Sequence, residues 1–291
     1  MTKIETSQLI KISGACNKAF SIKISIYLSM MSLGGVLFFQ DSYLSYIGIL
    51  VLGFSFAHGV ELQHQVLHGG AFTNAKLNRI TGFLLGAPML VAYSNYQASH
   101  LVHHAKVGTE GDTEFFEFNT LDENTTWITK LSCFFLISHY FEFTKRLIKA
   151  LSGKSISPKF NKLTNNKIRD EYLMMLTLIV VSVSVSIYFD SLSHLLVWLL
   201  PLCLIAAPIH TLIEFPEHFG CNNESEDIFE NTRSIRASSF MVWYTNGNNY
   251  HVEHHMYPLV RPEKLSILHR RINSNIVNIN VSYSEFFLES I

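Results

Sequence analysis

The sequence predicts an all-α integral membrane protein, with four transmembrane helices arranged as two hairpins and a cytosolic helical cap that carries a site for two metal ions. The chain is 48% hydrophobic and only 15% charged, whereas a soluble domain carries about 25% charged residues. Four long apolar runs and three histidine clusters complete the pattern. We expect residues 1–291 to form a single domain.

The apolar runs come in two pairs. A helix needs about 20 mostly apolar residues to cross the hydrocarbon core of a bilayer. The expected spans cover about residues 24–39, 43–63, 172–189 and 195–213. Only a short polar break separates the members of each pair, so each pair is expected to form an antiparallel hairpin. The first run is short, but Lys23 at its edge can reach the interface and extend it.

The distribution of basic residues predicts the orientation. All 22 Lys and Arg residues lie before residue 24, between 64 and 171, or after 214. Positive residues stay on the cytoplasmic side of a membrane. Both termini and the cap, about residues 64–171 and 214–291, are therefore expected in the cytoplasm, and the chain is expected in the inner or cytoplasmic membrane.

Three cap segments have weaker patterns. Residues 81–94 are too short to span and are expected to form a re-entrant or interfacial segment, and residues 131–143 an amphipathic helix on the membrane surface. Either segment can equally form the packed interior of the cap. Residues 152–170 are polar and rich in lysine, as is typical of a solvated connection.

Eight of the 14 histidines lie in three short clusters. The clusters are His64-Gln-Val-Leu-His68, His100-Leu-Val-His103-His104 and His251-Val-Glu-His254-His255. In a helix, residues i, i+3 and i+4 share one face, so each cluster aims its imidazoles in one direction. One zinc ion needs only four ligands, so eight donors favour two transition-metal ions, for which iron, copper, zinc and nickel are all suitable. The third cluster is expected on a helix that follows the turn-forming residues 245–249 and stops near Pro258.

The order HxxxH, HxxHH, HxxHH on an apolar chain resembles the membrane fatty acid desaturase superfamily. Later motifs extend the resemblance to its bacterial branch, over about residues 50–270: Glu217-His218-Phe-Gly220, Asn231-Thr-Arg233-Ser and Asn249-Tyr-His251-Val-Glu-His254-His255-Met-Tyr-Pro258. One departure is Arg261, where relatives often carry a second proline. The resemblance implies a non-haem di-iron oxidoreductase, with two Fe²⁺ ions that zinc can replace in purified material, and O2 as co-substrate.

The resemblance also implies roles for three residues outside the clusters. His218 becomes a ninth ligand, although an isolated histidine is as readily structural. Glu214 corresponds by spacing to a polar residue close to a metal, bound directly, through water or by orienting an imidazole. Arg233 is a candidate contact for the substrate or the electron donor, through a carboxylate near the site or a phosphate, or else an ordinary surface arginine. The acidic residues expected around the ligands are Glu61, Asp112, Glu114 and Glu253.

The function implied is that of a desaturase introducing a double bond into a fatty acyl chain linked to lipid, coenzyme A or a carrier protein. The histidine clusters do not exclude a hydroxylase or ketolase of an alkane, sterol or carotenoid. A membrane metal transporter is a third alternative, but transporters place their ligands near the bilayer midplane. Expected partners are membrane lipid and a separate electron donor, a ferredoxin or a cytochrome b5-type protein. The net charge of −1 gives no sign of a nucleic-acid partner.

Overall fold

Four long helices form the membrane-spanning part of the protein. The structure is a computed structural model that describes residues 6–40, 42–109, 111–112, 125–222 and 224–290. Within these residues, four helices are long and apolar enough to cross a membrane. They are α2 (Asn17–Phe38), α3 (Leu44–Leu67), α8 (Lys162–Tyr188) and the stretch Ser193–Glu214. All four predicted spans fall on these helices, which confirms the prediction of a mostly helical protein with four membrane-spanning helices. The cytosolic location of the cap stays a prediction.

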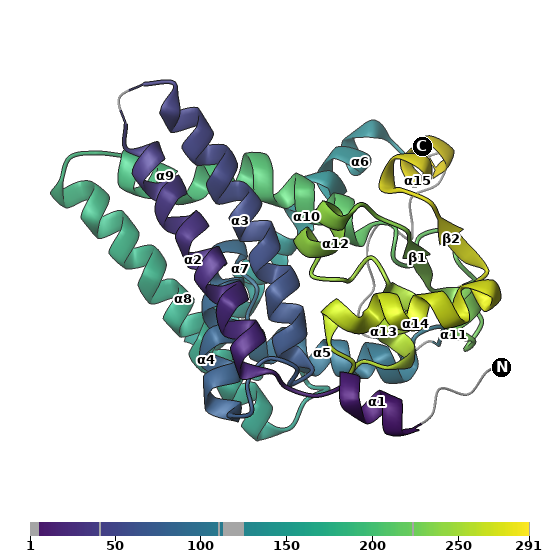
Figure 1. The fold of residues 1–291 in the computed structure, drawn as a ribbon. Coiled ribbons are helices and arrows are strands. Elements are labelled where there is room, and N and C mark those ends of the chain that lie inside the picture. The colour runs from purple at the N-terminus through teal and green to yellow at the C-terminus, as the bar shows by residue number, and fades with distance from the viewer. Residues whose placement is uncertain (1–5, 41, 110, 113–124, 223, 291) are drawn as a thin grey trace.

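Helix α3 is the centre of this arrangement. It packs against α2 and against the fourth long helix, while α8 packs against the fourth helix from the other side (Figure 1). In the most apolar stretch of α3, 56% of the residues are buried, against 17% in α2 and 22% in α8. The exposed apolar side chains of α2 and α8 are therefore available to lipid, and α3 is covered by protein.

Two glycines allow the neighbours of α3 to approach closely. A Cβ atom on Gly48 would lie 2.4 Å from the backbone nitrogen of Phe38 in α2. A Cβ atom on Gly53 would lie 2.3 Å from Cβ of Ile205 in the fourth long helix. Small residues at helix contacts are the usual means by which membrane helices pack backbone to backbone.

The fourth long helix is interrupted, which the sequence analysis did not predict. It consists of α9 (Ser193–Pro201), a π-helical turn (Leu202–Ala206) and α10 (Ala207–Glu214). Pro201 and Pro208 stand on either side of the turn and have no backbone N–H to donate. A wider turn is a common way for a helix to accommodate such missing hydrogen bonds. The interruption lies where Ile205 meets Gly53.

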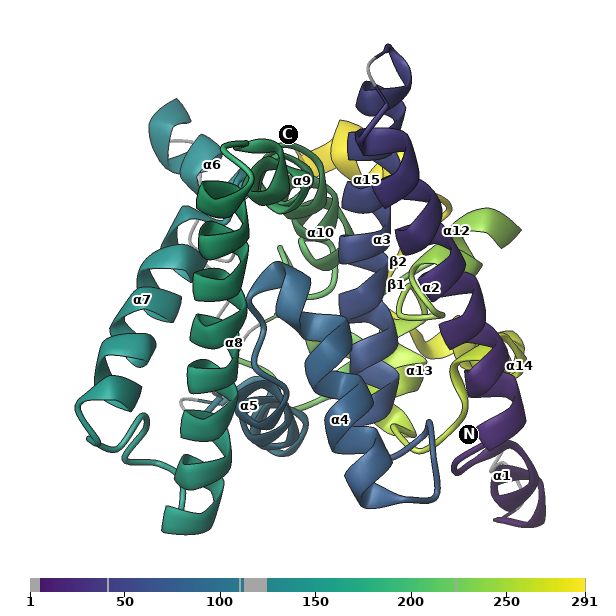
Figure 2. The same ribbon diagram turned by 90° about the vertical axis from the view of Figure 1, so that its left-hand side faces the viewer.

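The remaining elements are shorter, and they lie beside the spans and at the end where α2 begins and α3 ends (Figure 1, Figure 2). The helices are α1 (Thr6–Ile12), α4 (Ala75–Gly86), α5 (Tyr93–Lys106), α6 (Trp127–Phe134), α7 (Ile137–Leu151), α11 (Ile228–Asn231), α12 (Ser239–Tyr244), α13 (His251–Met256), α14 (Leu265–Ile272) and α15 (Tyr283–Ser290). Strand β1 (Arg233–Ile235) pairs in parallel with β2 (Asn278–Asn280). This small pair departs from the all-helical prediction.

The weakly patterned segments differ in part from the expectations. Residues 81–94 hold the end of α4, a 3-10 turn (Ala87–Met89) and the start of α5, and Gln63 of α3 donates to the backbone oxygens of Gly82 and Val91 inside this bend. Residues 131–143 belong to two helices, α6 and α7, rather than one. The connection expected up to residue 170 ends earlier, because the Asn161 side chain caps α8 by accepting from the Thr164 backbone N–H.

We predict that Gly53→Ala lowers the free energy of unfolding, by about 1–3 kcal/mol, because the new methyl group overpacks the contact with Ile205. The matched control is Gly35→Ala in α2, where an added Cβ meets nothing within 4 Å. Alanine is the better helix former by about 1 kcal/mol, so the control should be neutral or stabilised. Thermal unfolding of both variants in one detergent measures the difference. An unchanged melting temperature for Gly53→Ala would contradict the prediction.

Candidate metal centre

Nine histidines converge where the end of α3 meets α5 and α13. Their ring nitrogens form two groups, and within each group the donor atoms lie within 4.8 Å of one another. The first group contains His64, His68, His100, His104 and His254, and the second contains His103, His218, His251 and His255. All are buried except His104, which is half-buried. The structure therefore brings together the same nine histidines that the sequence analysis selected.

Four segments supply these side chains. His64 lies in the last turn of α3 and His68 directly follows that helix. The second cluster lies on α5 and the third on α13, which begins at His251 and ends at Met256, as expected from the flanking sequence. His218 lies in the turns that follow α10. The first cluster is thus fixed to a span, and the other ligands belong to the region beyond the spans.

Each HxxHH cluster contributes to both groups. An α-helix turns by about 100° per residue, so residue i+4 lies about 40° to one side of residue i and residue i+3 about 60° to the other. In both helices the first and last histidines join one group and the middle histidine joins the other. In α5 these are His100 and His104 against His103, and in α13 they are His251 and His255 against His254. The spacing therefore builds two adjacent groups from only two short helices.

The Nε2 atoms are in close contact. In the first group, Nε2 of His100 lies 2.7 Å from that of His64, 3.1 Å from that of His68 and 3.0 Å from that of His104. In the second group, Nε2 of His251 lies 3.2 Å from that of His218 and 3.1 Å from that of His255. Two nitrogens that bind the same ion at about 2.1 Å are about 3.0–3.4 Å apart, depending on whether the angle between them is octahedral or tetrahedral.

A chain of hydrogen bonds through the Asn248 side chain fixes the tautomer of His64. Asn248 donates through Nδ2 to Oε2 of Glu61 at 2.7 Å, which turns its amide oxygen toward the ring. His64 Nδ1 lies 2.7 Å from that oxygen and must donate to it, because an amide oxygen only accepts. Nε2 of His64 is then left with a lone pair directed into the first group.

Two histidines of the second group are fixed in the same way. His103 Nδ1 lies 2.9 Å from both carboxylate oxygens of Asp112, and His218 Nδ1 lies 2.9 Å from the backbone oxygen of Asn231. Hydrogen bonds of this kind orient metal-binding imidazoles and fix their tautomers. Nε2 of His100 faces three other Nε2 atoms and can share a hydrogen bond with only one of them, so the remaining lone pairs repel one another, and a cation between them removes the repulsion. The residues present therefore fit a metal ion in each group.

Burial keeps the histidines in the form that binds metal. Burial lowers the pKa of His218 to about 3, with a further contribution from the nearby His103 ring. Burial also lowers the pKa values of His100, His251 and His255 well below the ordinary value of 6.5, and neighbouring imidazoles add to the effect. These rings remain neutral at physiological pH, and neutral imidazole is the metal-binding form.

The acidic residues occupy different positions. Glu214 pairs with His210, with Oε1 3.1 Å from Nε2, and stands outside both groups. Glu217 lies closer, because its Oε2 is 3.3 Å from Nε2 of His251. The sequence analysis quoted Glu217 only within a motif and assigned it no role. Its position next to the candidate ligand His218 could have indicated that it lies close to the metal site. Glu114 lies outside the described residues.

Glu253 is part of a buried network. The basic neighbours Arg270 and Arg271 predict a solvated position for His269, but this ring is buried, with Nδ1 2.6 Å from Oε1 of Glu253. The Ser234 hydroxyl donates to the other oxygen of Glu253 at 2.6 Å and accepts from the backbone N–H of Val252. The missed signal was helical spacing, since the buried face of α14 consists of Leu265, Leu268, His269 and Ile272.

Arg233 stabilises the segment that carries His218. Its Nη1 donates to the backbone oxygens of Pro216 at 2.8 Å and Phe219 at 2.6 Å. Its guanidinium carbon also lies 4.8 Å from the centre of the Phe286 ring. A contact of Arg233 with substrate or electron donor stays a prediction.

Four further histidines stand outside both groups: His58, His139, His194 and His210. His58 Nδ1 lies 2.6 Å from the backbone oxygen of Tyr244, and His139 Nε2 lies 3.0 Å from that of Met89. A ring nitrogen that contacts a carbonyl oxygen carries the proton and donates. These two histidines therefore connect distant segments of the chain by hydrogen bonds.

Comparisons with known proteins agree with this site. The family model described as "Fatty acid desaturase" matches residues 41–287. A fatty acid desaturase of Bacillus subtilis (strain 168) is 27% identical over 246 residues, which cover 78% of this chain and 68% of that protein. A chloroplastic sn-2 acyl-lipid omega-3 desaturase (ferredoxin) of Helianthus annuus is 37% identical over 73 residues, covering 24% of this chain and 16% of that protein.

The matched range contains all nine clustered histidines and three of the four long helices, all but α2. An apolar, membrane-spanning framework and a site suited to metal ions are both what an oxidoreductase acting on lipid requires. The chain belongs to the fatty acid desaturase family.

Proposed function

We propose that the protein is an oxygen-dependent di-iron desaturase that introduces a double bond into a fatty acyl chain. The observation that carries this proposal is the pair of adjacent imidazole groups, which share α5 and α13. Five donors in one group and four in the other are enough to hold one ion each. Two adjacent ions are the arrangement expected for the four-electron reduction of O2.

The chain's own residues hold and isolate the metal ions in this proposal. All nine histidines act as ligands, while Asn248, Asp112 and the Asn231 carbonyl keep three of the rings in the binding tautomer. Bound iron would supply the oxygen chemistry needed to break an unactivated C–H bond. The protein's part is to position the acyl chain and to exclude water.

A separate electron donor follows from the electron count. Reducing O2 to two water molecules takes four electrons, and removing two hydrogens from the acyl chain supplies two. The other two must come from another protein, and the Helianthus relative carries ferredoxin in its name. A cytochrome b5-type protein is the alternative donor.

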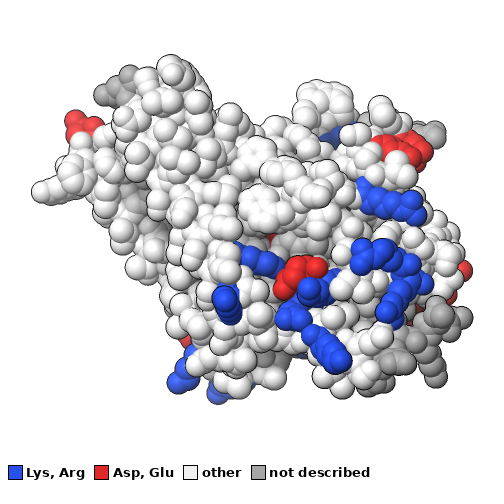
Figure 3. Space-filling view, viewed as in Figure 1, with Lys and Arg blue, Asp and Glu red and all other residues white. Residues whose placement is uncertain are grey.

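The proposed orientation places the metal centre in the cytoplasm. In Figure 3, Lys and Arg side chains gather over the start of α2 and over the short elements beside and below it, and the opposite end of the spans shows none in this view. This distribution supports a cytoplasmic location for the cap and the termini, since positive residues stay inside. The donor protein would then dock from the cytoplasm.

We expect cells that express the gene to contain lipids lighter by two hydrogens than those of cells without it, because desaturation removes two C–H bonds and inserts no oxygen. Mass spectrometry of total lipid measures this difference. A gain of one oxygen would instead assign the protein as a hydroxylase and overturn the proposed reaction, while leaving the metal centre in place.

We expect purified protein to hold two metal ions per chain, because each histidine group offers enough donors for one ion. Elemental analysis per mole of protein measures the stoichiometry. Iron is expected in iron-supplied cells, and zinc in its place would still agree with two sites. A ratio of one in well-folded protein would contradict the assignment of two groups to two ions.

We expect variants of the two groups to lose different ions. The double variant His68→Ala with His104→Ala leaves three donors in the first group, and His218→Ala leaves three in the second, so each should retain about one ion per chain and lose turnover. His194→Ala is the control, because His194 stands outside both groups and should leave metal content and turnover unchanged. Two tightly held ions in His218→Ala would exclude His218 as the ninth ligand.

A further inference from the structure

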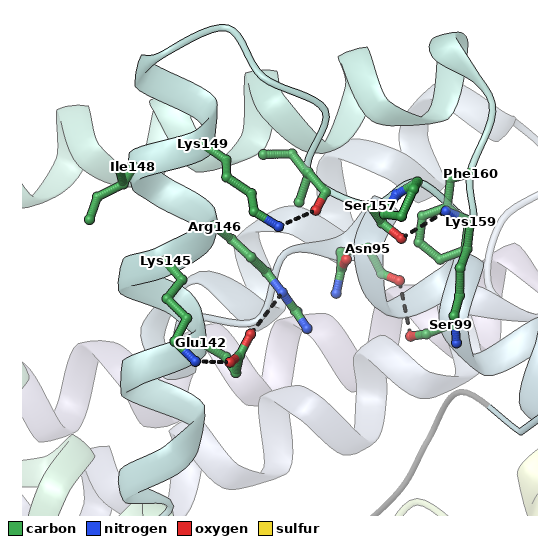
Figure 4. A pocket seen from close by; sticks show the side chains of 12 residues that line it. Asn95, Ser99, Glu142, Lys145, Arg146, Ile148, Lys149, Ser157, Lys159 and Phe160 are labelled. Atoms are coloured by element: carbon green, nitrogen blue, oxygen red, sulfur yellow. Dashed lines mark hydrogen bonds and ion pairs between the residues drawn. The ribbon is translucent and has the colours of Figure 1, made fainter.

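A basic cavity of about 630 Å³ lies between α7, the loop that leads to α8, and α5 (Figure 4). Its lining includes four cationic side chains and one carboxylate: Lys145, Arg146, Lys149, Lys159 and Glu142. The chain as a whole has a net charge of −1. The excess of positive charge is therefore a property of this cavity rather than of the protein's composition.

The wall of the cavity is held in place by a buried side chain. Asn165 donates to the backbone oxygens of Ser157 and Phe160, and its own oxygen accepts from the Ser157 backbone N–H. Lys149 fastens the same loop by donating to the backbone oxygen of Ile156 at 3.1 Å. The loop is thus ordered by the protein alone, and a ligand need not order it on binding.

The single carboxylate does not neutralise the cavity. Lys145 Nζ lies 2.6 Å from Oε1 of Glu142, and Arg146 Nε lies 4.0 Å from Oε2. The hydrogen bond from Lys145 lowers the pKa of Glu142, so this carboxylate is ionised. In Figure 4, Arg146 and Lys149 extend from α7 toward the loop that carries Ser157. An anion between them would meet more cationic groups than anionic ones.

The cavity lies beside the start of the apolar run of α8. The Phe143 ring of α7 contacts Tyr172 of α8, with ring centres 5.4 Å apart, where the apolar run of α8 begins. The cationic residues of α7 follow Phe143, and Arg169 of α8 donates to the Ala150 backbone oxygen at that level. Aromatic side chains at the start of a span are typical of the bilayer interface.

Exposed apolar side chains stand beside the cations. Ile148 lines the cavity and is 60% exposed, and Leu151 on the next turn of α7 is 58% exposed. A small soluble anion would gain no binding free energy from these apolar side chains, whereas the glycerol and acyl part of a lipid can cover them and remove them from water. Basic pockets on the cytoplasmic side of membrane proteins commonly bind lipid head groups.

We propose that this cavity binds the phosphate of a membrane phospholipid head group. Arg and Lys provide the charge-assisted hydrogen bonds that a phosphate accepts. The floor of the cavity includes Asn95 and Ser99 of α5, and Ser99 directly precedes the clustered His100. The bound lipid would therefore lie one helix diameter, about 10 Å, from the metal centre. The proposal goes beyond the proposed function, because this binding requires neither metal nor turnover.

The test measures binding of dihexanoyl phosphatidylglycerol to the full-length protein, delipidated in an uncharged detergent. The variant Lys145→Gln with Lys159→Gln should bind it about tenfold more weakly, since each lost cation removes one phosphate contact. The matched control, Lys130→Gln with Lys154→Gln, removes the same charge from residues that do not line the cavity. Its affinity should equal that of wild type, and an equal loss in the control would overturn the proposal.

The variant Glu142→Gln tests the same cavity by making its charge more positive, which should raise the affinity instead of lowering it. Removing the one lining carboxylate should tighten phosphatidylglycerol binding several-fold, which a purely structural role of Glu142 would not produce. Dihexanoylglycerol, which lacks the phosphate, should bind far more weakly, and inorganic phosphate should bind more weakly because it cannot cover Ile148. Equal affinity for dihexanoylglycerol would overturn the phosphate assignment, and equal affinity for inorganic phosphate would overturn the lipid assignment.

Discussion

The crowding of neutral imidazole nitrogens at the end of α3 is the constraint around which the rest of the protein is arranged. Nε2 of His100 lies about 3 Å from three other Nε2 atoms and can share a proton with only one of them, so the remaining lone pairs oppose folding unless a cation lies between them. Burial adds to the requirement, because water cannot enter to separate the rings. The free energy of metal binding therefore becomes part of the folding free energy of the cap.

The groups that orient the histidine rings come from elements far apart in the sequence. The orienting groups come from separate elements: Glu61 of α3 through Asn248, Asp112 after α5, and the Asn231 carbonyl at the end of α11. A further network links Glu253 of α13 to His269 of α14. Helices as short as α11 and α13 are unstable in isolation, so these contacts help to keep them folded. The positions of the histidines are therefore fixed by contacts between many segments that are distant in the sequence.

The spans and most of the clustered histidines could be predicted from the sequence, because local patterns define them. Contacts between distant segments could not be predicted in this way. Apolar runs and the i, i+3, i+4 spacing are local patterns, so the spans and the eight histidines of the three clusters were accessible, whereas His218 followed only from the family resemblance. Asn248 was read as a turn residue and Glu217 was given no role, because their contacts with His64 and His251 depend on which segments meet in space. The π-helical turn beside Gly53 depends on packing between two spans. His269 is different, because its place on the apolar face of α14 was a local signal that was overlooked.

The division of the molecule into lipid-facing spans and a polar cap suits a reaction with two kinds of reactant. An acyl chain is concentrated in the bilayer, where α2 and α8 expose their apolar faces. In the proposed reaction, electrons come from a separate protein, which would dock on the side away from the lipid. A centre built jointly by the end of a span and by cap helices stands where both reactants can approach it. Because α5 and α13 each contribute to both histidine groups, a shift of either helix would change both groups together, and the two ions would act as one unit.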